Sequence, residues 1–149
     1  MIKIHYLICV AICLLAVTGL GKDAPVVIPK LTPEVITDLQ KRYGSKVENL
    51  PSSPVLRKRV NPVPPFPEKG KHMQDGMAGF ILVVGRDGKV AELYLQRSSD
   101  ESFAVSGYEA LIKWVFPPAD QERLCAMTFI YRYLDDGSIS VLFNPPRGK

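Results

Sequence analysis

The side chains that could perform chemistry in this 149-residue sequence are few. Cys125 is the only cysteine, and His72 the only histidine, after the first 21 residues. A cysteine nucleophile needs a partner base or a lowered thiol pKa, whereas Cys125 lies in a strand-like run without an adjacent basic residue. Asp135 and Asp136 precede a glycine, as turn-forming residues do, and no group of residues has metal-ligand spacing. We therefore expect a protein that is not an enzyme and that holds no metal or cofactor.

The first 21 residues have the pattern of a secretory signal peptide. Lys3 provides a basic start, residues 4–17 are almost entirely apolar, and Gly19 and Gly21 precede a cleavage site before Lys22. The alternative is an uncleaved membrane anchor, but the apolar run of about 14–17 residues is at or below the roughly 17–25 that span a bilayer. We favour cleavage, which leaves an exported chain with one cysteine and no intrachain disulfide.

The charge pattern argues against nucleic acid as a partner. The formal net charge of +4 is small and spread along the chain, and only Arg57-Lys58-Arg59 forms a dense basic cluster. A run of three basic residues in a linker is typical of a solvated flank. We expect a protein partner, with a membrane contacted only through residues 1–21 if these are not cleaved. A domain that binds the cell wall through its basic surface stays an alternative.

Residues 22–60 form a proline-punctuated segment that we expect to be a largely extended linker, because proline fixes φ and removes backbone donors. One short helix, at about residues 33–43, should interrupt it. Thr32 is a candidate N-cap, and Gly44 lies where a C-terminal glycine cap belongs. Its single apolar stripe consists of Val35, Ile36, Leu39 and Tyr43. Such a helix must dock on another surface or fray.

Residues 61–149 are expected to form one compact α+β domain with an antiparallel sheet. Residues 80–84 are apolar on both faces, as in a central strand of a covered sheet. Residues 89–97 alternate between apolar and polar side chains, as in a half-buried strand. The turn between them has Gly88 where a positive φ is needed, so the two segments should form a hairpin.

One helix and a second hairpin should complete the domain. Ser106 and Glu109 have the spacing of a capping box, which predicts that the helix starts at Ser106 and ends at Pro117. Its apolar stripe consists of Leu111, Trp114 and Val115. Residues 124–134 read as a third strand, joined by a turn at Asp136-Gly137 to a short fourth strand at residues 139–143. The expected order is β-β-α-β-β, with the helix packed on the sheet through Trp114.

Several short patterns occur in the order and at the intervals of a known family. They are Phe66-Pro67 in a proline-rich run, Asp87-Gly88-Lys89-Val90 at the first hairpin turn, Ser98-Ser99 after the second strand, and Trp114-Val115-Phe116-Pro117 at the end of the expected helix. The chain from about residue 61 to residue 143 therefore resembles the C-terminal domain of the TonB family. The residues that carry the resemblance are Phe66, Pro67, Asp87, Gly88, Trp114 and Pro117.

The resemblance implies a function that the residues alone do not show. TonB proteins are anchored in the inner membrane of Gram-negative bacteria, work with the ExbB–ExbD proton-driven motor, and bind a short segment of outer-membrane transporters. Their C-terminal domain adds that segment to its sheet as a strand, so that backbone hydrogen bonds supply much of the attraction. The expected function is therefore a TonB-like periplasmic binding domain that captures an extended strand of an envelope partner by β-augmentation.

Two features depart from the family pattern. The family's membrane histidine lies deep in a longer helix, whereas His5 precedes most of the apolar run here. Residues 22–60 reach at most roughly 130–140 Å when fully extended, which is short for a spacer across the periplasm. We therefore favour a periplasmic or secreted module. The alternative is a short energy transducer, anchored in the inner membrane and facing the periplasm, that couples the ExbB–ExbD motor to outer-membrane transport.

The expected binding site is the outer edge of the third strand. With residues 80–84 in the centre of the sheet, the free edge of residues 124–134 is where a partner strand can join, and residues 139–143 can act as a displaceable cover. The residues assigned to this edge are Cys125, Met127, Thr128, Phe129, Tyr131 and Tyr133. A permanently paired fourth strand without a ligand, and a homodimer through the edge, stay open as alternatives.

Cleavage of the signal peptide is directly testable. We expect the mature protein to begin near Lys22 and to be released from cells by osmotic shock, because no anchor remains after cleavage. N-terminal sequencing of the released protein and immunoblotting of the inner-membrane pellet provide the measurement. A full-length chain in that pellet would contradict cleavage and support the anchored alternative.

Overall fold

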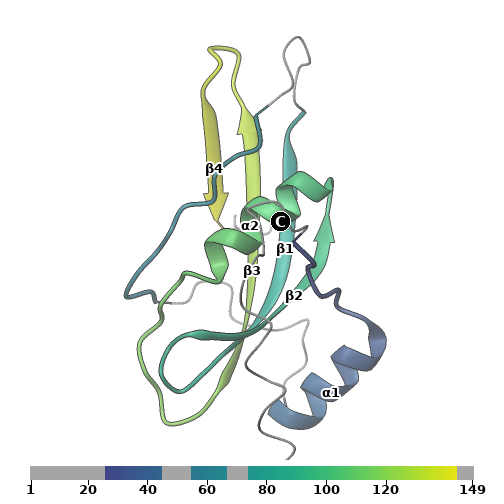
Figure 1. The fold of residues 1–149 in the computed structure, drawn as a ribbon, viewed down its shortest axis with the longest axis vertical. Coiled ribbons are helices and arrows are strands. Elements are labelled where there is room, and N and C mark those ends of the chain that lie inside the picture. The colour runs from purple at the N-terminus through teal and green to yellow at the C-terminus, as the bar shows by residue number, and fades with distance from the viewer. Residues whose placement is uncertain (1–25, 45–54, 67–73, 144–149) are drawn as a thin grey trace, which may run out of the picture.

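The computed structural model describes residues 26–44, 55–66 and 74–143. They form two helices and a four-stranded antiparallel sheet, so the fold is α+β, as expected. In chain order the elements are α1 (Pro33–Tyr43), β1 (Gly76–Val84), β2 (Val90–Ser98), α2 (Glu101–Leu111), β3 (Arg123–Tyr133) and β4 (Ile139–Phe143) (Figure 1).

The sheet has the order β2-β1-β3-β4, and every neighbouring pair is antiparallel. β1 is therefore central, and all of it except the half-buried Met77 is buried, which confirms the prediction from its apolar faces. β4 pairs with the outer edge of β3, also as predicted. Gly88 and Gly137, in the two hairpin turns, have φ of 83° and 79°, which residues with a side chain rarely adopt.

The helix α2 begins earlier than its sequence signals predicted, at Glu101 instead of Ser106. The prediction of a capping box at Ser106 and Glu109 is wrong, because Asp100 caps the helix. The Asp100 carboxylate accepts hydrogen bonds from the Ser102 amide at 2.9 Å and from the Ser102 hydroxyl at 2.6 Å. Ser106 lies inside the helix and is buried there.

The residues after α2 also differ from the prediction. Trp114 and Val115 follow the helix, so they do not continue its apolar stripe. The Trp114 amide donates to the Leu111 carbonyl at 3.0 Å in the closing turn. Val115 then forms antiparallel bridges with both Lys58 and Lys89. An extended backbone at Val115 can therefore pair with two separate segments, which a helical one could not.

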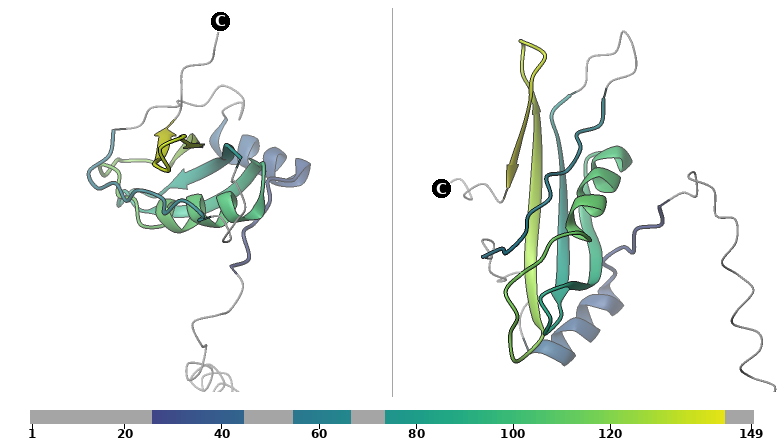
Figure 2. Two further views of the ribbon diagram at one scale, coloured as in Figure 1. Left: turned by 90° about the horizontal axis from the view of Figure 1, so that it is seen from above. Right: turned by 60° about the vertical axis from the view of Figure 1, so that its left-hand side comes forward.

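Different parts of the chain cover the two faces of the sheet. α2 and residues 55–66 lie on one face, and α1 lies on the other (Figure 2). The first face carries the larger apolar cluster, which includes the single tryptophan. The sheet is thus the middle layer of the described structure, and β1 is buried on both sides because both faces are covered.

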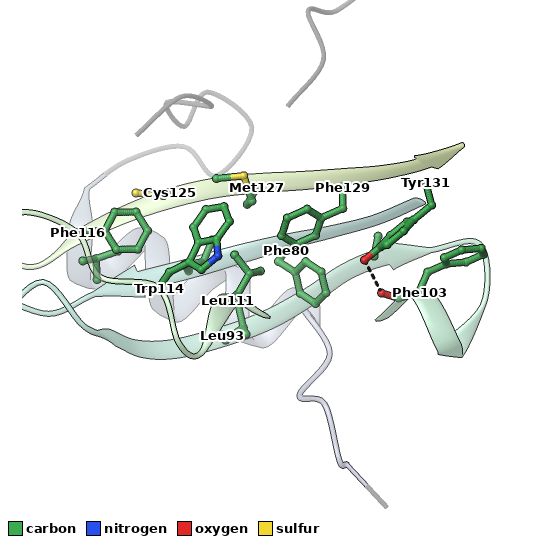
Figure 3. Close-up of a cluster of buried hydrophobic side chains, with 13 residues drawn as sticks. Phe80, Leu93, Phe103, Leu111, Trp114, Phe116, Cys125, Met127, Phe129 and Tyr131 are labelled. Carbon is green, nitrogen blue, oxygen red and sulfur yellow. Dashed lines mark hydrogen bonds between the residues drawn. The ribbon is translucent and has the colours of Figure 1, made fainter. Parts of the chain in front are cut away.

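Trp114 lies at the centre of the larger cluster, with 1% of its surface exposed. Its ring is edge-on to Phe129, with 5.9 Å between centroids, and tilted against Phe116 at 6.4 Å (Figure 3). Leu93 belongs to the same cluster. The prediction that Trp114 packs on the sheet is therefore confirmed, although Trp114 is not a helical residue.

The helix α1 has the predicted bounds and caps. Thr32 is its N-cap, and Gly44 follows it with a φ of 62°. Its apolar stripe docks on the sheet through the fully buried Leu39, which joins Ile81 and Val83 of β1 in a second cluster. This part of the expected linker is therefore packed against the domain.

Polar contacts fix the end of α1. The Arg42 guanidinium makes two hydrogen bonds with the Glu92 carboxylate of β2, at 2.7 and 2.8 Å. The Arg42 guanidinium lowers the pKa of Glu92, which therefore stays ionised at neutral pH. The Tyr43 hydroxyl donates to the Glu122 carboxylate at 2.7 Å. These contacts set the orientation of α1, whereas the burial of Leu39 supplies its apolar attachment.

Trp114 offers a direct test of the core. Trp114→Ala should lower the free energy of unfolding by about 3–5 kcal/mol, the usual cost of emptying a large aromatic site. Trp114→Phe keeps an aromatic ring but loses the hydrogen bond from the indole Nε1 to the Val60 carbonyl, which is 2.7 Å long. We expect this variant to lose about 1–3 kcal/mol. Urea unfolding followed by circular dichroism measures both, and a loss below about 1 kcal/mol for Trp114→Ala would contradict a central role.

Candidate functional site

The outer edge of β3, where the sequence predicted the binding site, is only partly covered. β4 pairs with residues 129–133 of β3. β3 itself begins at Arg123, and within the described residues no strand pairs with its outer edge from Arg123 to Met127. The edge therefore has a covered half next to the hairpin turn and an open half at the other end (Figure 1).

Hydrogen-bond alternation decides which backbone groups of β3 face this edge. Consecutive residues of a strand direct their N–H and C=O groups to opposite sides. The Tyr133 amide donates to Asp75, on the β1 side, whereas the Leu134 amide donates to the Ser138 carbonyl, on the β4 side; both bonds are 2.9 Å long. The register of β3 has no shift, so the outward residues are Leu124, Ala126, Thr128, Ile130 and Arg132.

The outward residues divide between the two halves of the edge. Ile130 and Arg132 pair with β4. Thr128 lies at the boundary between the halves. Leu124 and Ala126 lie in the open half, while their side chains belong to the cluster under α1. Their backbone groups are therefore the ones that an added strand would meet first.

The same alternation divides the six predicted edge residues into two groups, according to the side to which their backbone groups point. Thr128 presents its backbone to the outer edge. The other five direct their backbone groups to β1 and their side chains to the α2 face: Cys125, Met127, Phe129, Tyr131 and Tyr133. The structure brings these five together as a row of the core. The sequence did contain a signal for the outward residues of β3, at Gly137. A glycine at this place in a hairpin turn fixes which two residues form the closing pair of the hairpin, and hence which residues of β3 face outward.

The pKa values of the buried titratable groups in this row do not suit acid–base chemistry at neutral pH. Burial raises the pKa of the Cys125 thiol, so it is protonated at neutral pH. Burial also raises the pKa of Tyr131 to about 12, and its hydroxyl donates to the Ser106 hydroxyl at 3.1 Å. His72, the one histidine after residue 21 that could serve as a base for Cys125, lies outside the described residues.

Two of the motifs in the family resemblance meet in space. The Asp87 carboxylate accepts from the Lys89 amide at 3.0 Å inside the first hairpin turn. The Gly88 carbonyl of that turn accepts from the Phe116 amide at 2.8 Å. A Cβ at Gly88 would lie 2.1 Å from the Phe116 carbonyl oxygen, so a larger residue would force the two segments apart. These motif residues hold the turn against the chain that follows α2.

The remaining motif residues have separate surroundings. Trp114 is in the core, and the Pro117 carbonyl accepts a hydrogen bond from the Arg123 guanidinium. Phe66 is 77% exposed, and Pro67 lies outside the described residues.

β4 is anchored at its far end by Phe143. The Phe143 ring lies 5.4 Å from that of Phe129 and 6.0 Å from that of Trp114, between centroids. The guanidinium of Arg59 lies over the Phe143 ring at 4.7 Å. Phe143 is half-buried, and Val141 is the other β4 side chain that packs against the same cluster. Displacing β4 from β3 therefore means withdrawing Phe143 and Val141 from the border of the core.

The opposite edge of the sheet, along β2, is covered at one point by the segment before α1. Lys30 forms a parallel bridge with Leu95: the Leu95 amide donates to the Pro29 carbonyl at 2.7 Å, and the Leu31 amide donates to the Leu95 carbonyl at 2.8 Å. Continuing this ladder would next require amide donors at Pro29 and Pro33, and proline has none. The segment covers the edge at one point and cannot extend into a longer strand.

The described residues contain no other candidate centre of chemistry. Within these ranges no three histidine, cysteine or carboxylate side chains gather as metal ligands would. Neither of the two described helices has the length and apolar character needed to cross a membrane. Comparison with known proteins gives no matching family model, no matching curated protein and no matching solved structure.

The anchoring of β4 can be measured residue by residue. In Phe143→Ala, the amides of Ile130 and Arg132, which pair with β4, should exchange with solvent roughly tenfold faster or more, because the strand opens locally. The amide of Phe129 faces β1 and should be accelerated much less. Hydrogen exchange followed by NMR distinguishes the outcomes. Equal acceleration at all three amides would indicate global loosening, and unchanged exchange would contradict the anchor.

Proposed function

We propose that this protein is a TonB-like binding domain of the periplasm that captures an extended segment of an envelope protein as an added strand. The proposal takes its class from the sequence motifs and its site from the open half of β3. It rests on one observation above the others: the outward backbone groups of Leu124 and Ala126 have no strand beside them among the described residues. The protein is then a binding module and not an enzyme.

The packing of β3 supports this use of its edge. The side chains of Leu124 and Cys125 point to opposite faces of the sheet, and only 6% and 3% of their surfaces are exposed. Both faces therefore hold the strand in place while its outer backbone groups remain available. A strand that is already ordered loses little conformational entropy on binding, which favours affinity. Backbone pairing at such an edge is the usual basis of β-augmentation.

Because β4 covers only part of this edge, a partner strand can bind to it in two stages. An incoming strand can first pair at Leu124 and Ala126 without disturbing the hairpin. Pairing further along β3 requires the partner to replace β4 at Ile130 and Arg132. The site that Phe143 would leave is walled by aromatic rings, so we expect the preferred partner to carry a large apolar side chain at that place.

The proposal concerns the domain and holds for both alternatives at the N-terminus. A cleaved signal peptide gives a periplasmic or secreted module, and a retained segment gives an inner-membrane protein whose domain faces the periplasm. The partner is a protein of the cell envelope, such as a segment of an outer-membrane transporter.

A proline at Ala126 tests the edge. Ala126→Pro removes an outward amide donor but none of the hydrogen bonds to β1, so partner capture should fall at least tenfold while the domain stays folded. Ala126→Val keeps the donor and is the matched control. Crosslinking pull-down from envelope fractions with the tagged full chain, quantified by mass spectrometry, gives the readout.

The two variants separate strand capture from other modes of binding. A protein retained by the wild type and by Ala126→Val, and lost with Ala126→Pro, is the partner expected here. Phe143→Ala should increase the amount captured, because β4 then competes less for the edge. Equal capture by all variants, with thermal unfolding confirming that each is folded, would place the binding surface elsewhere.

A further inference from the structure

Residues 55–66, here called the strap, run across the α2 face of the sheet, beside α2 (Figure 2). The backbone of Arg57 and Lys58 pairs with Val115 at the start of the strap, and further along the strap is held by hydrogen bonds from side chains to its carbonyls. The Trp114 Nε1 donates to Val60 at 2.7 Å, the Ser106 hydroxyl to Val63 at 2.5 Å, and the Tyr133 hydroxyl to Pro65 at 2.6 Å. The three donors come from the chain after α2, from α2 itself and from β3.

This set of contacts suits a proline-rich ligand. None of the three contacts requires an amide donor from the strap, and Pro62, Pro64 and Pro65 have no such donor. Prolines favour the polyproline II helix, which has three residues per turn, so the carbonyls of Val60 and Val63 fall on the same side. Pro62, between them, is buried. Aromatic surfaces with side-chain donors are the means by which known domains recognise such peptides.

The three donor side chains also need hydrogen-bond acceptors in the groove that the strap fills. Trp114 is 1% exposed and Ser106 is 7% exposed with the strap in place. The Ser106 hydroxyl accepts from Tyr131, so its own hydrogen is directed to the strap. If the strap left without a replacement, polar groups would lose their acceptors beside exposed aromatic surface. The groove is therefore built for a ligand that supplies carbonyl groups.

We propose that Trp114, Ser106 and Tyr133 form a recognition site for proline-rich peptides, and that a second copy of this chain supplies such a peptide in trans through its own strap. Each copy carries the sequence that is already seated in the groove. Reciprocal exchange would therefore preserve every contact described above and would need no new interface, as in domain swapping. The groove is separate from the open edge of β3, so this inference goes beyond strand capture.

A pair of matched substitutions opens the groove. Pro62→Asp places a charge at a buried position of the strap, so the strap should leave and the emission of Trp114, the only tryptophan, should shift to longer wavelength. Val55→Asp places the same charge at the first residue of the strap, where the side chain is 77% exposed, and should leave the emission unchanged. If Pro62→Asp does not fold, as judged by circular dichroism, Pro62→Gly combined with Pro64→Gly provides the open form.

A synthetic peptide with the sequence of residues 55–66 then tests binding in trans. Added to the open form, it should reverse the emission shift in a saturable manner. Added to Val55→Asp, it should need at least a tenfold higher concentration, because the tethered strap competes at an effective concentration in the millimolar range. A control peptide with its prolines replaced by alanine should bind at least tenfold more weakly than the parent peptide. No saturable change in a folded open form would overturn the proposed site.

Complementary variants test whether a second copy is the source of the ligand. The open form has a vacant groove, and Ser106→Ala combined with Tyr133→Phe weakens the groove while keeping an intact strap. An equimolar mixture should form a 1:1 complex by analytical ultracentrifugation, whereas each variant alone should be monomeric. A monomeric mixture, together with peptide binding, would overturn exchange between copies. All of these variants keep the open edge of β3, so a failure here is distinguishable from a failure of strand capture.

Discussion

The packing of the strands and the strap depends on the contacts made by the indole of Trp114. Its ring contacts Phe129 of β3 and Phe143 of β4, and its N–H donates to the strap at Val60. One side chain therefore joins the third strand, the cover strand and the strap, which come from distant parts of the chain. This explains why Trp114 follows α2 and is not part of it. In the tight turn that ends the helix, the indole reaches between these segments, and Val115 can still pair on both sides.

Coverage of both faces of the sheet leaves its edges as the place for the proposed partner strand. α2 and the strap occupy one face (Figure 2), while α1 packs on the other against Ile81 and Val83 of β1 and Leu124 of β3. The broad apolar surfaces are therefore used internally, and the backbone at the edges is what remains. Because backbone pairing depends little on partner sequence, selectivity has to come from the few side chains next to the edge, such as those around Phe143.

Local signals predicted the parts of this fold that local chemistry controls. The glycines at 88 and 137 predicted both hairpins, and Thr32 with Gly44 predicted α1, because turns and caps depend on neighbouring residues. The start of α2 was misplaced because Ser106 has the spacing of a cap, yet its hydroxyl binds Val63, 43 residues away. The edge was identified from the apolar pattern of β1, but the outward residues were not, since that pattern describes side chains and not backbone groups.

The two prolines beside the bridge between Lys30 and Leu95 limit how far this segment can pair with the edge of β2. Pro29 and Pro33 prevent the ladder on β2 from lengthening through this segment, while β3 keeps its open half on the other side. A fibre made by stacking sheets edge to edge needs two edges that can both accept strands. Only the part of β2 beside Leu95 is covered in this way, so the protection against edge-to-edge stacking that Pro29 and Pro33 give is local to that part of the edge.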